Sequence, residues 1–181
     1  MKMNKVKAIW TRAVYSTCEY CEDPEDFIDT SSLDNEETAR IENPVRVMEY
    51  DSIDKAIRDF LSSNVTGEDD GIGIEEKTVT DESTMQTSVV DCRLHVEHPN
   101  MKKKGTEFVR LSNDELESLG EDDSLRVYNF HDVLHVEYMD GSSADKDARK
   151  IYRNGYERLC VCRVPVERQR ILGEMRKEFK E

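Results

Sequence analysis

The sequence contains few of the residues that mark specialised classes of protein. Its 181 residues include 8 glycines and 4 prolines, so neither a collagen-like nor a low-complexity chain fits the composition. No segment approaches the roughly 20 consecutive apolar residues that a membrane-spanning helix needs. The positively charged N-terminus has no apolar stretch behind it, which argues against a secretory signal. We therefore expect a globular protein of the cytoplasm.

Cysteine is also scarce, and its pattern favours reduced thiols. The five cysteines make an odd, low number for a disulfide-linked secreted scaffold. Cys18 and Cys21 form a C-x-x-C pair, and Cys160 and Cys162 form a second, closer pair. Four thiolates can hold a structural zinc ion, although two pairs of two-residue spacing are the usual arrangement. The other interpretation is that the second pair is buried as small apolar side chains.

The motifs of common enzyme classes are missing. No G-x-x-x-x-G-K-[ST], G-x-G-x-x-G, G-x-S-x-G or H-E-x-x-H occurs, so phosphate loops, dinucleotide sites, nucleophile elbows and zincin sites have no support. Neighbouring acids such as Glu75 and Glu76 are expected to be solvated rather than to carry a raised pKa. We accordingly assign no catalytic residue, no metal ligand and no cofactor, and we do not expect an enzyme.

Negative charge is what the sequence has in excess. The net charge is −14, from 40 acidic and 26 basic residues. Residues 19–54 contain thirteen acids and two arginines, and residues 68–82 contain seven acids and one lysine. Residues 145–181 have the opposite sign, with eleven basic residues against seven acids. Because phosphate binding depends on Lys and Arg, this balance argues against nonspecific affinity for nucleic acid or anionic lipid, and no membrane contact is expected.

Hydrophobic periodicity predicts an α+β fold: an antiparallel sheet with a helix in the N-terminal third and a C-terminal amphipathic helix. Asp51 or Ser52 caps a helix with an apolar stripe from Ile53 to Leu61. Ser112 and Glu115 have capping-box spacing, and Pro165 opens the closing helix. Further short helices are expected over 35–41 and 145–152. Strands are expected over 6–15, 45–50, 72–80, 87–97, 106–111, 125–130, 133–139 and 159–163, with turns at 99–100, 104–105 and 140–141.

The polar stretch 66–71 is the best candidate boundary in the chain. It separates an acidic strand and helix region, residues 1–66, from a region of sheet and closing helix, residues 67–181. The alternative is one domain over 1–181.

The chain contains one short internal repeat, Leu94-His-Val-Glu97 and Leu134-His-Val-Glu137. In a strand, Leu and Val point to one face and His and Glu to the other, so two such strands paired in register would gather two imidazoles and two carboxylates. The set is His95, Glu97, His135 and Glu137, with His98 and His131 close by in sequence. Such ligands suit zinc, manganese or iron(II), and a metal-dependent enzyme is the alternative function. The simpler interpretation is the solvated face of a half-exposed sheet.

The acidic runs are interleaved with aromatic residues, and this combination predicts a binding surface. Carboxylates can occupy a basic groove that accepts a phosphate backbone, while aromatic rings supply desolvated anchors. The candidate partner-binding residues are Glu19, Tyr20, Glu22, Asp23, Glu25, Asp26, Phe27, Glu68, Asp69 and Asp70. The other interpretation is that these acids only keep the protein soluble.

Residues 18–29 and 67–76, with the overall charge, resemble the small acidic inhibitors that phages and mobile elements carry against host defence. These include anti-CRISPR proteins against Cas9-type effectors and acidic antirestriction proteins. The resemblance implies a non-catalytic inhibitor of a basic nucleic-acid-handling protein, such as a Cas9–guide RNA complex, in the host cytoplasm if a phage encodes it. The basic C-terminal helix predicts a second contact, with guide RNA, DNA or the acidic half of another copy in a homodimer. Its residues are Arg168, Arg170, Arg176 and Lys177.

Overall fold

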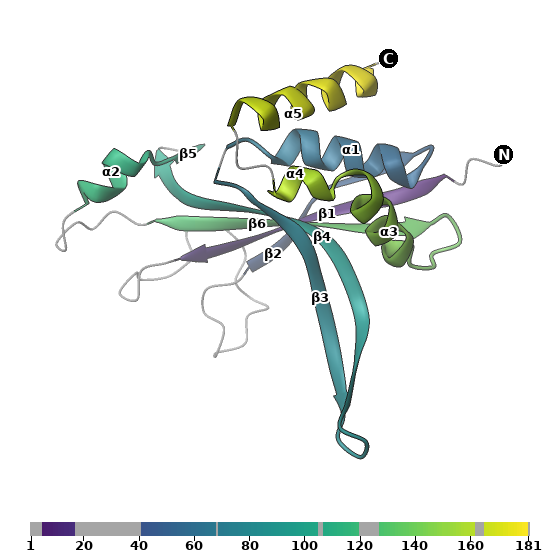
Figure 1. The fold of residues 1–181 in the computed structure, drawn as a ribbon. Helices are drawn as coiled ribbons and strands as arrows, with labels where there is room; N and C mark the ends of the chain where they lie inside the picture. Colours follow the sequence, from purple (N-terminus) through teal and green to yellow (C-terminus); the bar gives the residue numbers. More distant parts are fainter. Residues whose placement is uncertain are drawn as a thin grey trace.

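The strands of this computed structural model form one antiparallel sheet in the order β2-β1-β6-β4-β3, with β5 paired to β4 (Figure 1). The structure describes residues 5–16, 41–67, 69–104, 107–119, 127–161 and 165–180. The strands are β1 Val6–Ser16, β2 Ile41–Tyr50, β3 Gly71–Asp81, β4 Gln86–Lys104, β5 Glu107–Arg110 and β6 Tyr128–Tyr138. The helices are α1 Ile53–Asn64, α2 Asn113–Glu117, α3 Asp145–Gly155, α4 Glu157–Val161 and α5 Pro165–Lys180.

Four helices contribute to one core on a single face of the sheet, here called the helix-covered face. Alternation along the strands places the apolar side chains of β1, β4 and β6 on this face. The helices α1, α3, α4 and α5 supply the opposing side chains. Fully or nearly fully buried members include Val6, Ala8, Trp10, Ile57, Phe60, Leu61, Leu94, Val96, Leu134, Val136, Tyr152, Leu159 and Leu172.

Helix α1 forms where the sequence pattern predicts it. Ser52 is the N-cap, and its hydroxyl accepts a hydrogen bond from the Lys55 backbone N–H at 3.2 Å. Ile57 and Phe60 of the apolar stripe are buried, and the Phe60 ring meets the Trp10 ring edge-on at 5.6 Å between centroids. The other predicted cap is also present, because Ser112 and the N3 glutamate of α2 form a capping box.

The antiparallel sheet, the N-terminal helix and the closing helix from Pro165 are therefore confirmed. The turn at residues 140–141 is confirmed as well, with Gly141 at φ 85°. The predicted helix over 35–41 falls outside the described residues except for Ile41, which belongs to β2. Strands from both sides of the predicted boundary after residue 66 share the sheet, since β1 pairs with β6 along its whole length.

Three predicted breaks or strands are wrong. β4 continues through the predicted turn at 99–100, because Asn100 takes a left-handed conformation, φ 59°, within a register shift between His98 and Met101. β6 is one strand rather than two, since Asp132 at its centre is buried and ion-paired. Residues 157–161 form α4 instead of a strand. Tyr152, Tyr156 and Leu159 are all buried and recur with helical spacing.

Candidate functional site

The face of the sheet opposite the helix-covered face carries a concentration of titratable side chains, and we call it the polar face. Alternation places there Glu75, Arg93, His95, Glu97, His131, His135 and Glu137. Neighbouring strands β3, β4 and β6 therefore present imidazoles and carboxylates side by side.

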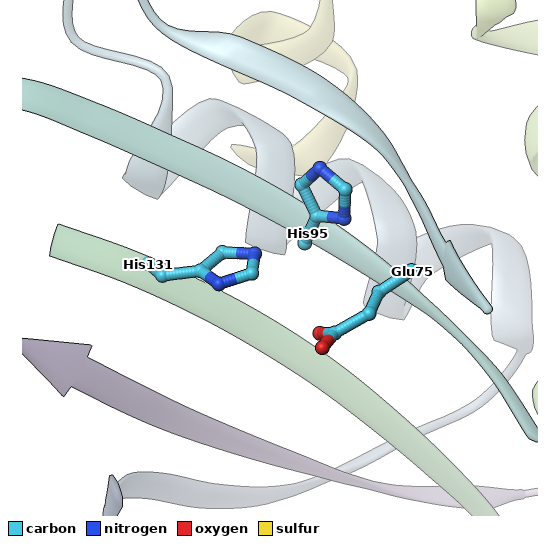
Figure 2. Close-up of side chains that lie close together, drawn as sticks. All are labelled: Glu75, His95 and His131. Atoms are coloured by element: carbon cyan, nitrogen blue, oxygen red, sulfur yellow. The ribbon is translucent and has the colours of Figure 1, made fainter. Parts of the chain in front are cut away.

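Three of these side chains form a compact group, the polar-face cluster of Glu75, His95 and His131 (Figure 2). One ligand atom from each residue lies within 4.8 Å of the other two, and all three side chains are half-buried. The two imidazole rings meet nearly edge-on, with 4.8 Å between centroids and an interplanar angle of 82°. Figure 2 shows the carboxylate extending from β3 towards the two rings.

Register explains why these three residues meet. Gly73 of β3 lies opposite His95 of β4, and Glu75 is two residues farther along the same face. Val133 of β6 lies opposite His95 on the other side, and His131 is two residues away. Diagonal neighbours of this kind lie within reach of long side chains. Gly73 also leaves room for the ring, because a Cβ added there would lie 3.3 Å from His95 Nε2.

The surroundings of His95 favour its neutral form. Burial lowers the pKa of His95, and repulsion from His131 lowers it further, although Glu97 and Glu75 act in the opposite direction. Its Nδ1 is buried without a hydrogen-bond partner among the described residues. A neutral imidazole keeps a lone pair that can bind a metal ion.

The two Leu-His-Val-Glu segments are neighbours, but they do not build the four-residue site that the repeat suggests. Leu94 lies opposite Leu134, and the strands run antiparallel. His95 therefore groups with His131, whereas His135 Nδ1 lies 2.5 Å from Asp145 and its Nε2 lies 3.0 Å from Glu137. The hydrogen bond with Asp145 raises the pKa of His135 despite its burial. Among the described residues, His135 thus holds the start of α3 against β6.

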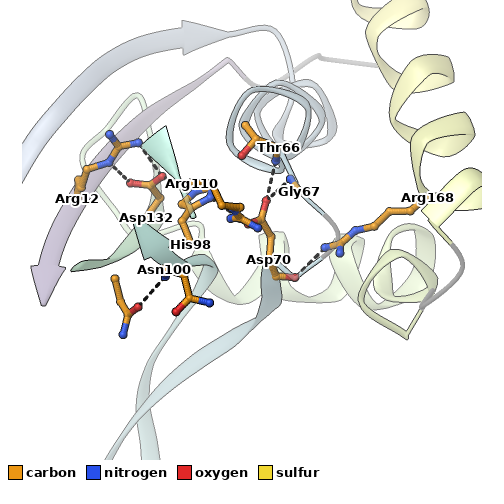
Figure 3. Close-up of polar contacts among 10 residues, drawn as sticks. Arg12, Thr66, Gly67, Asp70, His98, Asn100, Arg110, Asp132 and Arg168 are labelled. Atoms are coloured by element: carbon orange, nitrogen blue, oxygen red, sulfur yellow. Dashed lines mark hydrogen bonds and ion pairs between the residues drawn. The ribbon is translucent and has the colours of Figure 1, made fainter. Parts of the chain in front are cut away.

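A second group of charges lies on the helix-covered face, and we call it the buried ion-pair network because its two acids and its histidine are buried, while its two arginines are partly exposed (Figure 3). Its members are Arg12, Asp70, His98, Arg110 and Asp132. His98 bridges the two acids: its Nε2 lies 3.0 Å from Asp132 Oδ2, and its Nδ1 lies 3.3 Å from Asp70 Oδ1. Arg12 donates from Nε and Nη2 to both oxygens of Asp132, at 2.7 and 3.0 Å.

The network shifts the pKa of Arg12, Asp70, His98 and Asp132 in the direction of the charged form. Burial alone would raise the pKa of Asp70, but hydrogen bonds from His98 and from the Gly67 and Thr66 N–H groups bring it to about 2. Burial likewise opposes the charged form of His98, yet its bonds to both acids raise its pKa. The network ties four strands to the loop after α1. No local pattern in the sequence signals it, because its members are far apart in the chain.

Of the predicted partner-binding residues, the structure describes only Asp69 and Asp70, and these two differ in exposure. Residues 19–27 and Glu68 lie outside the described residues. Asp69 is exposed, whereas Asp70 is 5% exposed and belongs to the ion-pair network. Asp70 is therefore turned into the molecule, because both its oxygens have intramolecular donors.

Three of the four basic residues of α5 that the sequence singles out have partners within the protein. Arg168 is buried and donates to the Asp70 backbone carbonyl at 2.8 Å. Arg170 is paired with Glu167 and Glu174 along the helix, and Arg176 donates to the Ser62 carbonyl at 3.1 Å. Lys177 is exposed. A nucleic-acid contact through this helix stays a prediction.

The cysteine pairs are not tested, because Cys18, Cys21 and Cys162 and the side chain of Cys160 fall outside what the structure describes. Cys92 is a free, buried thiol on β4, and burial raises its pKa.

The hairpin of β3 and β4 projects away from the rest of the molecule, and we call its residues 76–90 the hairpin arm (Figure 1). Every residue of the arm is exposed, including Val79 at 51% and Met85 at 77%. Val89 and Val90 are exposed as well. The turn is ordered by Asp81, which accepts hydrogen bonds from the Ser83 N–H at 2.8 Å and from its hydroxyl at 2.6 Å.

In comparisons with known proteins, no family model, curated protein or solved structure matches this chain. Over the described residues, no helix combines the length and the apolar character needed to cross a membrane.

Proposed function

We propose that this chain is a non-catalytic binding protein that inhibits a basic, nucleic-acid-handling host protein, with a Cas9-type CRISPR effector as the first partner to test. The hairpin arm is the observation that supports this function. Fifteen consecutive residues, 76–90, are exposed, and four of them are large apolar side chains. Only at the base of the arm do the described ion pairs reach the body, where Glu76 pairs with Arg149 and Arg153 of α3. Exposed apolar residues concentrated on one projecting element are typical of an interaction surface.

The arm combines two kinds of contact that a partner can use. Val79, Met85 and Val90 are side chains that a partner would desolvate, as anchor residues are in protein interfaces. Asp81 and Glu82 at the turn carry negative charge, and the acidic run from residue 68 to 82 continues along β3 to this point. A cationic groove would complement this charge.

The backbone of the arm is also available. β4 pairs with β6 only from Leu94 onward, so over residues 86–90 its described neighbour is β3 alone. The outer edges of both arm strands can therefore accept a strand from a partner, a common mode of peptide recognition.

The acidic segment around residues 19–27 remains part of this proposal as a prediction. Its charge would attract the same cationic partner. Salt screens this attraction beyond the Debye length, which is on the order of 10 Å at 0.1 M ionic strength. Inhibition is then expected to weaken as salt is raised.

The first experiment removes the apolar anchors of the arm. In the triple variant Val79→Ser, Met85→Ser, Val90→Ser, we expect inhibition of DNA cleavage by a purified Cas9–guide RNA complex to fall about tenfold or more, since anchor residues each contribute over about 1 kcal/mol. Val166→Ser is the matched control, because Val166 is 80% exposed but lies on α5. Equal inhibition by both variants would remove the arm from the binding surface.

The second experiment reverses charge. Changing Glu22, Asp23, Glu25 and Asp26 to Lys should abolish binding at low salt. The control is Glu107→Lys with Glu117→Lys, two exposed acids elsewhere in the structure. If the wild-type protein neither inhibits cleavage nor associates with any purified cationic nucleic-acid-binding protein at low salt, the proposed function is wrong.

A further inference from the structure

We propose that Glu75, His95 and His131 bind one divalent transition-metal ion of the Zn²⁺ class on the polar face. This inference does not rest on the proposed function, and it replaces the ligand set that the repeated tetrapeptide suggests. The residues come from three neighbouring strands of one sheet, so their backbone positions are mutually held by the ladders β3·β4 and β4·β6.

The distances suit a common metal ion. Ligand atoms about 2.0–2.2 Å from Zn²⁺ in tetrahedral geometry lie roughly 3.3–3.6 Å from one another. In this structure the three ligand atoms lie within 4.8 Å of one another. Closing the remaining gap of about 1 Å requires only side-chain rotation, because the imidazole and carboxylate groups stand on flexible torsions.

The donor set selects the class of metal. Two imidazole nitrogens and one carboxylate oxygen suit zinc, manganese, iron(II) or cobalt, whereas Mg²⁺ and Ca²⁺ prefer sites made of oxygen. The Nδ1 atom of His95 is buried and has no hydrogen bond among the described residues. A metal ion bound to the ring, after rotation of the ring where needed, would supply an imidazole nitrogen with a partner.

The charges around the cluster favour a cation. Glu97 lies opposite His131 in the β4–β6 register and adds a second carboxylate beside the cluster. The nearby positive groups are Arg93, opposite Glu75, and Lys77, which lines the same hollow as Glu75. The Arg93 guanidinium is directed to Asp91 at 3.0 Å and to Asp145 at 3.8 Å, and Lys77 lies opposite Asp91. The local balance is therefore negative.

Of its three residues, Glu75 alone borders a hollow, and the proposed site keeps a free coordination position. This hollow of about 420 Å³ is also lined by Thr11, Arg93 and Val133. Three protein ligands leave at least one position of a tetrahedral ion for water or for a group supplied by a partner. Glu75 is also the last residue before the hairpin arm, so a bound ion would tie the base of the arm to β4 and β6.

The test uses the full chain stripped of metal with a chelator. We expect calorimetric titration with Zn²⁺ to give one saturable site that Glu75→Gln and His95→Gln each weaken at least about tenfold, since loss of an outer-shell partner alone costs that much. His135→Gln is the matched control: it is the same substitution at the equivalent position of the other tetrapeptide, outside the cluster. Zn²⁺ should also raise the melting temperature of the wild type and of His135→Gln, but not of the two cluster variants.

Co²⁺ as a spectroscopic probe distinguishes this site from the cysteine pairs. We expect the visible absorption of cobalt bound to nitrogen and oxygen, without thiolate charge-transfer bands. The same spectrum should appear in the double variant Cys18→Ser, Cys21→Ser. Binding that persists in Glu75→Gln and His95→Gln but disappears in the cysteine variant would overturn the proposal, as would the lack of any saturable binding. Glu75→Gln keeps the shape of a partly exposed side chain, so loss of binding there is not a loss of folding, and circular dichroism checks this.

Discussion

His95 and His98 lie three residues apart on β4, and the sheet gives them opposite surroundings. His98 points to the helix-covered face, where two carboxylates bracket its ring and raise its pKa. His95 points to the polar face, where burial and a second imidazole lower its pKa. The ion-pair network favours the charged form of His98, whereas the polar face favours the neutral form of His95. A histidine's role in this protein therefore follows from the face it occupies more than from its neighbours in sequence.

Breaking the buried ion-pair network should have the largest effect. Asp132→Ala leaves the Arg12 guanidinium and the His98 ring without their shared acceptor, and Asp132 is 2% exposed. Removing one partner of a buried pair typically costs about 3–5 kcal/mol, so we expect a loss of at least about 3 kcal/mol in the free energy of unfolding. Urea denaturation of Asp132→Ala measures it. Asp114→Ala, an exposed acid of α2, is the control, and similar losses in both variants would contradict the network's role.

The same network predicts a pH window for stability. The lowered pKa of Asp70, about 2, stabilises the fold above the ordinary value of 3.8, and this contribution is lost as the pH falls towards 2. The raised pKa of His98 stabilises the fold below 6.5, and its contribution is lost as the pH rises through the folded value. We expect the network to contribute most between about pH 4 and 6.5, with Asp70 supplying about 2 kcal/mol.

This window is measured by comparing wild type with Asp70→Asn in urea at several pH values. The difference in free energy of unfolding should be largest near pH 5 to 6 and should shrink near pH 2. A difference that does not vary with pH would mean that Asp70 acts through packing alone.

On the polar face, by contrast, we expect little loss of stability in the absence of metal. His95→Gln removes a half-buried ring that has no ion-pair partner comparable to those of His98. Its free energy of unfolding should fall by about 1 kcal/mol or less, within the common range for single substitutions. Chemical denaturation of the chelator-treated protein tests this. A loss as large as that of Asp132→Ala would make the cluster a structural element of the sheet.

Gly73→Ala should have the smallest effect on stability, and it tests the polar-face cluster directly. Gly73→Ala places a methyl group 3.3 Å from His95 Nε2, which is tighter than ordinary contact. Reduced freedom of the unfolded chain offsets some of this cost, so the net change should stay within about 1 kcal/mol. Affinity for Zn²⁺ should nevertheless fall, because the ring must move. Unchanged affinity in calorimetric titration would show that His95 Nε2 does not need the space beside Gly73.

Local sequence signals predicted those parts of the fold that depend on nearby residues. Ser52 and Ser112 mark helix starts through their own side chains, and alternation marks the strands of the sheet. The same local logic failed at residues 157–161, where Leu159 reads as part of a strand. There the deciding contact is burial of Leu159 with Tyr152 and Tyr156, which only the packed helices provide.

The candidate site divides in the same way. The repeated tetrapeptide includes His95, and His131 lies close to its second copy in the sequence. For Glu75, by contrast, the sequence predicts only a solvated surface acid. Its place beside the imidazoles depends on the pairing of β3 with β4 and of β4 with β6. A residue's partners across a sheet are set by strand order, direction and register, and none of these is encoded within a short stretch of chain.

The sequence by itself determined the class of fold, the excess of negative charge and the positions of the capped helices, because composition and short-range periodicity act without distant partners. The tertiary structure alone decided that His95 meets Glu75 and His131 while His98 joins Asp70 and Asp132. Successive side chains of a strand point to opposite faces, and what each face meets depends on segments dozens of residues away.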